Sequence, residues 1–280
     1  MLWETIFNGD LATLKELLIK YSGDGAVLNW RNCEMDDWTP LIKAASFDQL
    51  DAIKLLAETP GIDLNARTAR GETSVMWAAF NGRATVLEYL LSLPGTDVNS
   101  RDDSGGSALL AAAAGGHSEA VRVLLAAPGV DVNAKSTDGH SALMMASYMG
   151  WTNVVQDILA SPGVLVDAKD NEGNTAFMFA ASFGKCDLVR YFATLPGIDF
   201  NSQDVDGMTA LMLAASRGHA EVVDYLLTLP IIDTGMLTFF GKAAHELASN
   251  DIIKESILAE INYREARDVN RPAPRSRSEL

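Results

Sequence analysis

The chain has 280 residues, of which 48% are hydrophobic, and a formal net charge of −15 at pH 7. This composition predicts a folded protein with an ample core, and its longest apolar stretch, residues 108–114, is far shorter than the ~20 residues of a membrane span. The acidity argues against nucleic acid as a main partner, because phosphate binding requires clustered positive charge.

The first residues and the cysteines bear on the compartment. Glu4 and Asp10 stand where a secretory signal would carry basic residues and an apolar block, so nothing here indicates export. Cys33 and Cys186 are far apart in the sequence, and we expect no disulfide between them. We therefore expect a reducing compartment, the cytoplasm, with the nucleus as the alternative.

Residues 1–38 are expected to form an N-terminal capping unit with a long loop. Apolar residues between Trp3 and Leu18 predict a shortened pair of helices. The connection that follows is longer than the later ones, because the step from Gly9 to the equivalent Asp48 exceeds the step from Asp48 to Gly82. We expect Trp30 or Trp38 to be exposed there.

Residues 39–240 contain a pattern that recurs at a constant interval, with a period of 34. Each hydroxyl residue of the pattern can cap a helix by accepting a hydrogen bond from its first free amides, and a preceding glycine supplies the turn. A period of this length is typical of repeat proteins, whose units cannot bury their apolar faces alone and therefore stack. The hydroxyl and apolar pairs are Thr39/Leu41, Thr73/Val75, Ser107/Leu109, Ser141/Leu143, Thr175/Phe177 and Thr209/Leu211.

Two helices are expected in each of the six copies. The first has small residues at its centre, such as Ala180 and Ala181, which let neighbouring helices approach closely. The second carries apolar residues spaced i, i+3, i+4, as at Val121, Leu124 and Leu125, which predicts one buried stripe. A Pro-Gly pair and an Asp-apolar-Asn segment then lead into the next copy.

Together these features resemble the ankyrin repeat. The resemblance rests on Gly-x-Thr-x-Leu, the Ala-Ala centre, Gly-His at 116–117 and 218–219, Val-x-x-Leu-Leu and Asp-Val-Asn, all in register. It implies an all-α solenoid of stacked helix-turn-helix units with projecting hairpin loops. It also implies that the first helices line a concave groove that binds other proteins. We expect a monomer without cofactor, metal or enzymatic activity, whose protein partner the sequence does not identify.

The chain departs from that family in two ways. Its period is one residue longer than usual, and the Pro-Gly link supplies the extra residue, which lengthens the loop after the second helix. Apolar residues also replace the histidine that often braces the family's loops, and they form either an adaptable binding strip or semi-buried packing between repeats. These residues are Ile42, Met76, Leu110, Met144, Met178 and Met212.

The C-terminal part is atypical, as the end of a stack should be. Residues 241–263 keep the register and then acquire the polar residues of a capping helix. Residues 264–280 are expected to be a disordered basic tail. Its last three residues, Ser278, Glu279 and Leu280, resemble a carboxy-terminal ligand of PDZ domains, although so short a match also arises by chance.

Partner contacts in ankyrin repeats come from positions outside the scaffold pattern. The resemblance implies contacts at the hairpin tips, between the glycine and the hydroxyl cap, and at the two residues that end each first helix. Large side chains at these positions favour a protein-binding patch, which small residues interrupt at Ala114/Gly115. Alternatively, rings such as Phe80 and Phe183 fold back onto the neighbouring repeat. The candidates are Trp38, Phe47, Arg70, Phe80, Asn81, Ser104, Tyr148, Met149, Glu172, Phe183, Val205, Met208 and Arg217.

A second candidate series is basic. It places positive charge beside the groove at the interval of the repeat and ends at Gln203. The series either binds an acidic segment of a partner or pairs with carboxylates such as Asp102, Asp170 and Asp204. Its members are Arg67, Arg101, Lys135 and Lys169.

The candidate catalytic and metal-binding motifs of the sequence lack residues that such sites require. His245-Glu246 begins like a zinc-protease helix, but Ser249 stands where the second histidine ligand is required. His117 and His219 recur in register with unrelated residues, so we interpret them as parts of the repeat. Phosphate loops and nucleophile elbows do not appear in the sequence.

These observations favour a non-catalytic scaffold or adaptor that binds a partner through the groove and the hairpin tips. One alternative is a regulator or inhibitor of a partner enzyme such as a kinase or protease. Another is that the repeats are a substrate of asparaginyl hydroxylases, because Asn99 and Asn133 follow leucines Leu91 and Leu125 at a spacing that resembles their targets.

Overall fold

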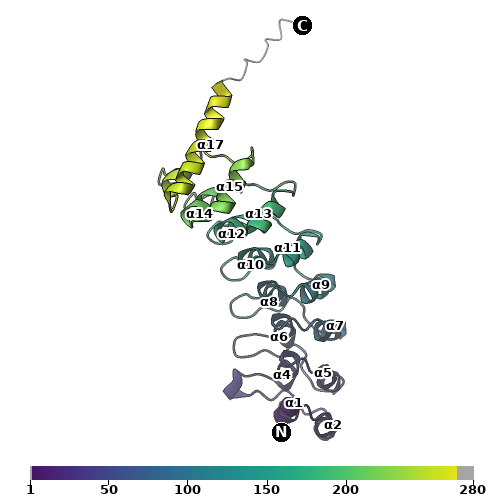
Figure 1. The fold of residues 1–280 in the computed structure, drawn as a ribbon. Helices are drawn as coiled ribbons and strands as arrows, with labels where there is room; N and C mark the ends of the chain where they lie inside the picture. Colours follow the sequence, from purple (N-terminus) through teal and green to yellow (C-terminus); the bar gives the residue numbers. More distant parts are fainter. Residues whose placement is uncertain (1, 270–280) are drawn as a thin grey trace, which may run out of the picture. The chain divides into compact units, whose positions relative to one another are not determined.

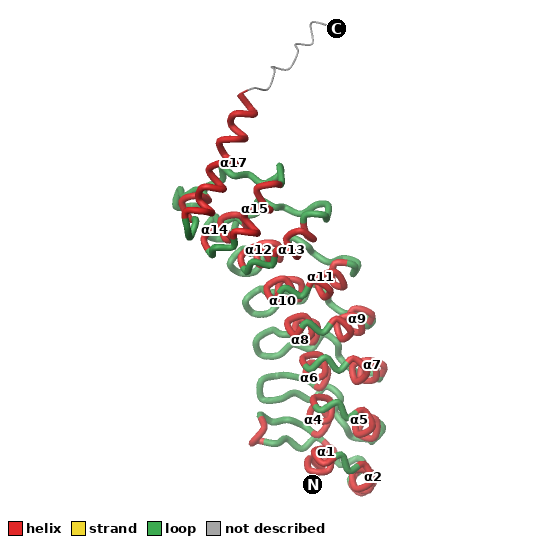
Figure 2. The backbone as a smooth tube through the Cα atoms, viewed as in Figure 1, coloured by secondary structure: helices red, strands yellow, loops and turns green. Residues whose placement is uncertain are grey.

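The computed structural model describes residues 2–269 of the chain. The chain forms two compact units, divided between Asn171 and Glu172. Within the described residues every regular element is a helix, which confirms the all-α expectation (Figures 1 and 2). Both cysteines, Cys33 and Cys186, are free, as expected.

The first unit is built from successive pairs of helices. The first helix of each pair packs against the first helix of the next, the second helices form a row of their own, and the connecting loops project beside the first helices (Figures 1 and 2). Its elements are α1 (Leu2–Asn8), α2 (Leu11–Lys20), α3 (Gly25–Leu28), the 3-10 helix η1 (Cys33–Met35), α4 (Pro40–Ser46), α5 (Leu50–Ala57), α6 (Ser74–Phe80), α7 (Ala84–Ser92), α8 (Ala108–Gly115), α9 (Ser118–Ala126), α10 (Ala142–Met149) and α11 (Thr152–Leu159).

The second unit uses the same pairing. Its elements are α12 (Ala176–Ser182), α13 (Cys186–Phe192), α14 (Ala210–Ser216), α15 (Ala220–Thr228), α16 (Ala244–Leu247) and α17 (Asp251–Val269). The first helices α12, α14 and α16 pack in sequence, and α13, α15 and α17 pack in a second row. The repeat therefore produces the same local architecture in both units.

The first helices begin where the sequence predicts. The hydroxyl oxygen of Thr39 accepts a hydrogen bond from the Ile42 amide at 3.4 Å, and Ser107 caps α8 in the same way at 3.3 Å. In the terminal unit Ala243 occupies this register and has no hydroxyl. There the Ala243 amide instead donates to the Glu246 carboxylate at 2.8 Å, so a different side chain satisfies the helix start.

The predicted stripe on the second helices is confirmed only in part. On α9, Val121 and Leu124 are fully buried, but Leu125 is half-buried and Ala120 completes the buried face. The stripe is rotated by one position because α9 packs on the first helix of its own pair and also on α7 and α11. Helical periodicity alone does not show on which sides of α9 the helices α7 and α11 lie.

The long connection after α2 is partly helical, containing α3 and η1. Trp30 is 50% exposed there, whereas Trp38 is only 8% exposed. The indole of Trp38 packs on Trp77, with 4.4 Å between ring centroids. Of the two tryptophans, Trp30 is therefore the exposed one, and Trp38 supports the next repeat and does not present its own ring as an accessible contact residue.

Lys43 attaches α1 to the first full repeat. Its ammonium group donates to the carbonyl oxygen of Trp3 at 3.2 Å and lies 3.9 Å from the centroid of the Trp3 ring. Burial lowers the pKa of Lys43, because the charged form loses hydration. The ring and the carbonyl compensate for part of that loss.

The C-terminal boundary differs from the expectation. Helix α17 continues through Val269, so residues 264–269, which the sequence assigns to a disordered tail, are helical. Arg264 explains the extension, since its guanidinium donates to the carbonyl oxygens of Leu227 at 3.0 Å and Leu229 at 3.2 Å. The PDZ-like residues 278–280 lie outside the described residues.

Candidate functional site

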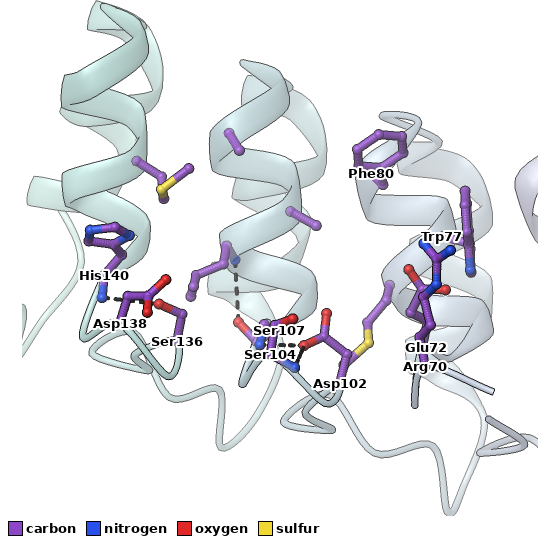
Figure 3. A pocket seen from close by; sticks show the side chains of 16 residues that line it. Arg70, Glu72, Trp77, Phe80, Asp102, Ser104, Ser107, Ser136, Asp138 and His140 are labelled. Carbon is purple, nitrogen blue, oxygen red and sulfur yellow. Dashed lines mark hydrogen bonds between the residues drawn. The ribbon is translucent and has the colours of Figure 1, made fainter. Parts of the chain in front are cut away.

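A groove with a volume of about 550 Å³ opens in the first unit. Side chains from α6, α8 and α10 and from the loops that precede these helices line it (Figure 3). The floor is apolar, whereas the loops form a polar rim. The floor residues are Met76, Trp77, Phe80, Leu110, Ala111, Ala114 and Met145.

The hollow exists because the middle repeat has small residues at two variable positions. Ala114 occupies the helix-end register in which the neighbouring repeats carry Phe80 and Tyr148. Gly106 likewise replaces a larger residue just before the hydroxyl cap. In Figure 3, Phe80 stands on one side of α8 and His140 on the other. The predicted gap at Ala114 is thus part of the groove floor, bounded by larger residues.

The rim of this groove is mainly acidic. Glu72, Asp102 and Asp138 line it, and Arg70 lines it too. The Arg70 guanidinium lies 3.2 Å from the carboxylate of Asp36, which offsets its charge. Negative charge therefore dominates the polar edge above an apolar floor.

The apolar series that replaces the family's histidine is buried throughout, with Leu110 the most exposed member at 7%. The packing interpretation is therefore correct, and the idea of an exposed binding strip is wrong, although Met76 and Leu110 reach the groove floor. Two of the methionines also bond to the start of their own helix. The Met144 sulfur accepts the Ser141 amide at 3.4 Å, and Met212 makes the equivalent contact at 3.5 Å, because a thioether is a weak acceptor.

The other helix-end candidates of the first unit divide into exposed and structural residues. Phe47, Tyr148 and Met149 are exposed, and Phe47 also meets α1 through an edge contact. Asn81 instead closes α6 by donating to the Trp77 carbonyl at 2.9 Å. The exposed residues remain candidate contacts, whereas Asn81 already has a structural role.

The tip candidates of the first unit belong to a backbone ladder. The Asp103 amide donates to the carbonyl of Arg70 at 3.0 Å, and the Thr137 amide donates to that of Ser104 at 2.8 Å. The side chains of Arg70 and Ser104 are exposed beside the groove. Because each tip is tied to the next, the rim is held in a defined arrangement.

Five candidates lie in the second unit, whereas every residue that lines the groove lies in the first. Glu172 and Val205 are exposed and Met208 is half-buried. Phe183 is half-buried beneath the guanidinium of Arg217, which lies 4.5 Å from the ring centroid. The fold-back interpretation therefore describes Phe183 but not Phe80, which is 57% exposed.

The basic series braces neighbouring repeats. Arg101 donates to the carbonyl oxygens of Gly105 at 2.8 Å and Lys135 at 2.7 Å, and it lies 3.7 Å from the Asp131 carboxylate. Lys135 in turn donates to the Lys169 carbonyl at 2.7 Å. The bonds from Arg101 to Lys135 and from Lys135 to Lys169 reach the following repeat, and neither interpretation of the sequence includes them.

Gln203, the neutral end of the series, shows that charge is not required for this contact. Its amide donates to the carbonyl oxygens of Gly207 at 2.7 Å and Leu237 at 2.9 Å, the same two registers that Arg101 uses. Arg67, at the other end, lies 3.8 Å from the Asp103 carboxylate. Arg101, Lys135 and Gln203 therefore share inter-repeat hydrogen bonding, and contact of the basic series with an acidic partner stays a prediction.

Replacing Arg101 tests this role. We expect Arg101→Gln to change the free energy of unfolding by less than about 0.5 kcal/mol and Arg101→Ala to lower it by about 1–2 kcal/mol, because only glutamine keeps both hydrogen bonds. Urea unfolding of the two variants measures the difference. Equal losses would instead assign the stabilisation to the ion pair with Asp131.

Asparagines form a second ladder between repeats, at the Pro-Gly links. The Asn99 amide donates to the Gly129 carbonyl at 2.7 Å and accepts from the Asp131 amide at 2.8 Å. Asn133 makes the same two bonds one repeat later, each at 2.8 Å. The lengthened link thus supplies the acceptor carbonyl. Hydroxylation of Asn99 and Asn133 stays a prediction, and an enzyme that needs an extended segment must first break these bonds.

Removing one rung of this ladder should loosen the link locally. We expect Asn99→Ala to lower the free energy of unfolding by about 1–3 kcal/mol, because two backbone groups lose their partner. Hydrogen exchange at residues 129–131 measures the local effect. Asn153→Ala, which changes an exposed side chain on α11, is the control. Unchanged exchange at 129–131 in Asn99→Ala would contradict the proposed role.

The recurring histidines are also braces. A His117 ring nitrogen lies 3.0 Å from the carbonyl oxygen of Phe80, and the Trp151 indole donates to that of Ala114 at 3.0 Å. His219 makes the equivalent contact in the second unit.

Over residues 2–269 we find no group of three side chains placed to hold a metal ion. The helices within these residues are all too short or too polar to span a membrane.

One exposed apolar tip in the second unit was not predicted from the sequence. Phe240 is 79% exposed and lies beside the exposed residues Phe239 and Leu237. Phe240 occupies the register of Asp206 one repeat later, so the register itself could have identified this tip. It is an apolar surface available to a partner.

Comparisons with known proteins agree with this geometry. The model of ankyrin repeats (three copies) matches residues 2–102, 75–170, 108–204, 152–238 and 177–255. The ankyrin repeat domain of human ASB11 is similar in structure, with a TM-score of 0.70 and 24% identity over 80% of this chain and 98% of that one. The ankyrin repeat domain of Bcl-3, a member of the IkappaB family, gives 0.69 and 24% over 80% and 99%. No curated protein matches the chain by sequence.

Proposed function

Because this chain belongs to the ankyrin-repeat family, whose repeats are generally protein–protein interaction modules, we propose that it is a non-catalytic adaptor that binds a partner protein through the groove of its first unit. The single observation that carries this proposal is the hollow over Ala111 and Ala114, which is open, apolar and bounded by larger side chains. The adaptor acts as a monomer in this proposal.

The groove has the features of a protein-binding surface. Aromatic residues contribute much of the binding energy of such surfaces, and Trp77 and Phe80 belong to the floor. The floor is also preorganised, since Trp38 supports Trp77 from the preceding repeat. A preformed surface binds more tightly because little order must be created on association.

Filling the hollow tests the proposal. We expect Ala114→Tyr to weaken partner binding at least about tenfold, because a ring would occupy the space that a partner side chain needs. The fold should tolerate this change, since Tyr148 occupies the same register one repeat later. The measurement is affinity capture from the natural source with quantitative mass spectrometry, followed by titration of the purified partner.

A matched control places the same ring elsewhere on the first unit. Ala126→Tyr changes an exposed residue at the end of α9 and should leave binding unchanged. If Ala114→Tyr captures the same proteins with the same affinity as the original chain, the groove is not the binding surface.

An enzyme regulator would use the same surface, so binding alone does not separate the two roles. Activity assays of each captured enzyme, with and without the chain, make the distinction. An adaptor leaves turnover unchanged. A change in turnover that Ala114→Tyr abolishes would favour regulation through the groove.

A further inference from the structure

We infer that the groove binds a segment of its partner in which an apolar side chain is flanked by lysine or arginine. This inference rests on the proposed function and adds the chemistry of the partner. The hollow over Ala111 and Ala114 requires the apolar side chain, and the charge of the rim selects the residues beside it.

The floor determines the central residue of the segment. A volume of about 550 Å³ falls within the range of pockets that enclose a ligand, and apolar or aromatic side chains form its base. Met76 and Leu110 are only 6% and 7% exposed, and the indole nitrogen of Trp77 is buried, so the base offers no accessible polar side-chain group. An aliphatic or aromatic residue fits this environment, because its burial removes apolar surface from water on both sides.

The rim determines the charge of the flanking residues. Glu72, Asp102 and Asp138 contribute three carboxylates, and the one guanidinium of the rim, that of Arg70, is offset by Asp36 at 3.2 Å. A lysine or arginine of the partner would face these three carboxylates, whereas a glutamate would be repelled by them.

Three further observations agree with a cationic partner. His140 also lines the rim, but its ring nitrogen lies 3.4 Å from the buried carboxylate of Asp170, so that histidine is directed toward a carboxylate of its own chain. The exposed ring of Phe80 offers an aromatic surface for the alkyl stem or the charge of lysine or arginine. The formal net charge of −15 adds long-range attraction for a basic segment.

The rim carboxylates differ in whether their replacement would break hydrogen bonds that hold the loops. Asp102 accepts hydrogen bonds from the amides of Ser104 at 2.9 Å and Gly106 at 2.7 Å, so it also holds the loop. Glu72 accepts from the Thr68 hydroxyl at 3.1 Å, a bond that glutamine preserves. The Asp138 side chain is exposed at a loop tip. The double variant Glu72→Gln/Asp138→Asn therefore removes charge from the rim while it keeps the loop contacts.

The experiment selects short random peptides displayed on phage against the full chain. We expect the enriched peptides to share an apolar residue flanked by lysine or arginine. Synthetic copies should bind Glu72→Gln/Asp138→Asn about three- to tenfold more weakly, and added salt should weaken their binding to the original chain. The control, Asp51→Asn/Glu88→Gln, removes the same charge from α5 and α7 and should change affinity less than twofold, as an approximate limit.

The outcomes separate this inference from the proposed function. Enriched peptides that lack basic residues but lose binding to Ala114→Tyr would overturn the inference and leave groove binding intact. Basic peptides that bind Ala114→Tyr unchanged would overturn groove binding itself. Equal weakening by the rim and control variants, or no enrichment at all, would also overturn the inference. Unfolding midpoints of all variants establish that each one is folded.

Discussion

Leu124→Ala is expected to lower the free energy of unfolding of the first unit by about 2–5 kcal/mol. Leu124 is fully buried on α9, and α9 packs on α7, α8 and α11. Truncation loses the transfer free energy of the removed atoms and leaves a cavity that the three neighbouring helices cannot close completely. Urea unfolding measures the loss, and hydrogen exchange locates it.

The location of the effect is as informative as its size. Stability in a repeat protein comes mainly from contacts between neighbouring repeats, so protection should fall first in α7, α8, α9 and α11. Leu125→Ala, one residue further along and half-buried, should cost only about 1 kcal/mol. Equal costs for the two variants, or uniform loss of protection over the whole chain, would contradict this account.

Ala180→Leu is expected to destabilise the second unit by about 1–3 kcal/mol. Ala180 has no exposed surface and lies at the centre of α12, which packs on α14. The added atoms have no space between closely approaching helices, so the helices must move apart or the side chain must adopt a strained rotamer. Thermal and urea unfolding both report the change.

The matched control is Ala259→Leu, which makes the same replacement at an exposed position of α17 in the same unit. Alanine and leucine have similar helix propensities, so we expect a change within about 0.5 kcal/mol. If Ala180→Leu is as mild as this control, the small residues at the helix centres are not required for packing.

Local features of the fold could be predicted because they depend on few neighbours. The caps at Thr39 and Ser107 involve atoms three residues apart, and the structure confirms them. The contacts of Arg101 and Asn99 were missed because their partners lie about one period away. A sequence pattern shows that such residues recur, but it does not show which backbone carbonyl each one reaches.

The candidate site was predictable as a set of positions and not as a surface. The variable registers included Phe80, which lines the groove, but also Asn81, which closes its own helix. Trp38 was expected to be a contact residue, and Trp77 covers it instead. The acidic character of the rim depends on Asp102 and Asp138, which lie in loops whose closeness the repeat pattern alone did not reveal.

The repeat, its helices, its caps and its family can be read from the chain, because every copy places the same residue types beside equivalent neighbours one period away. Which variable side chains remain accessible depends on how the repeats pack. Ala114 and Gly106 become a hollow only because larger residues of adjacent repeats stand on both sides, and that arrangement depends on how the helices pack. Burial of a side chain is a property of its surroundings, which no single repeat contains.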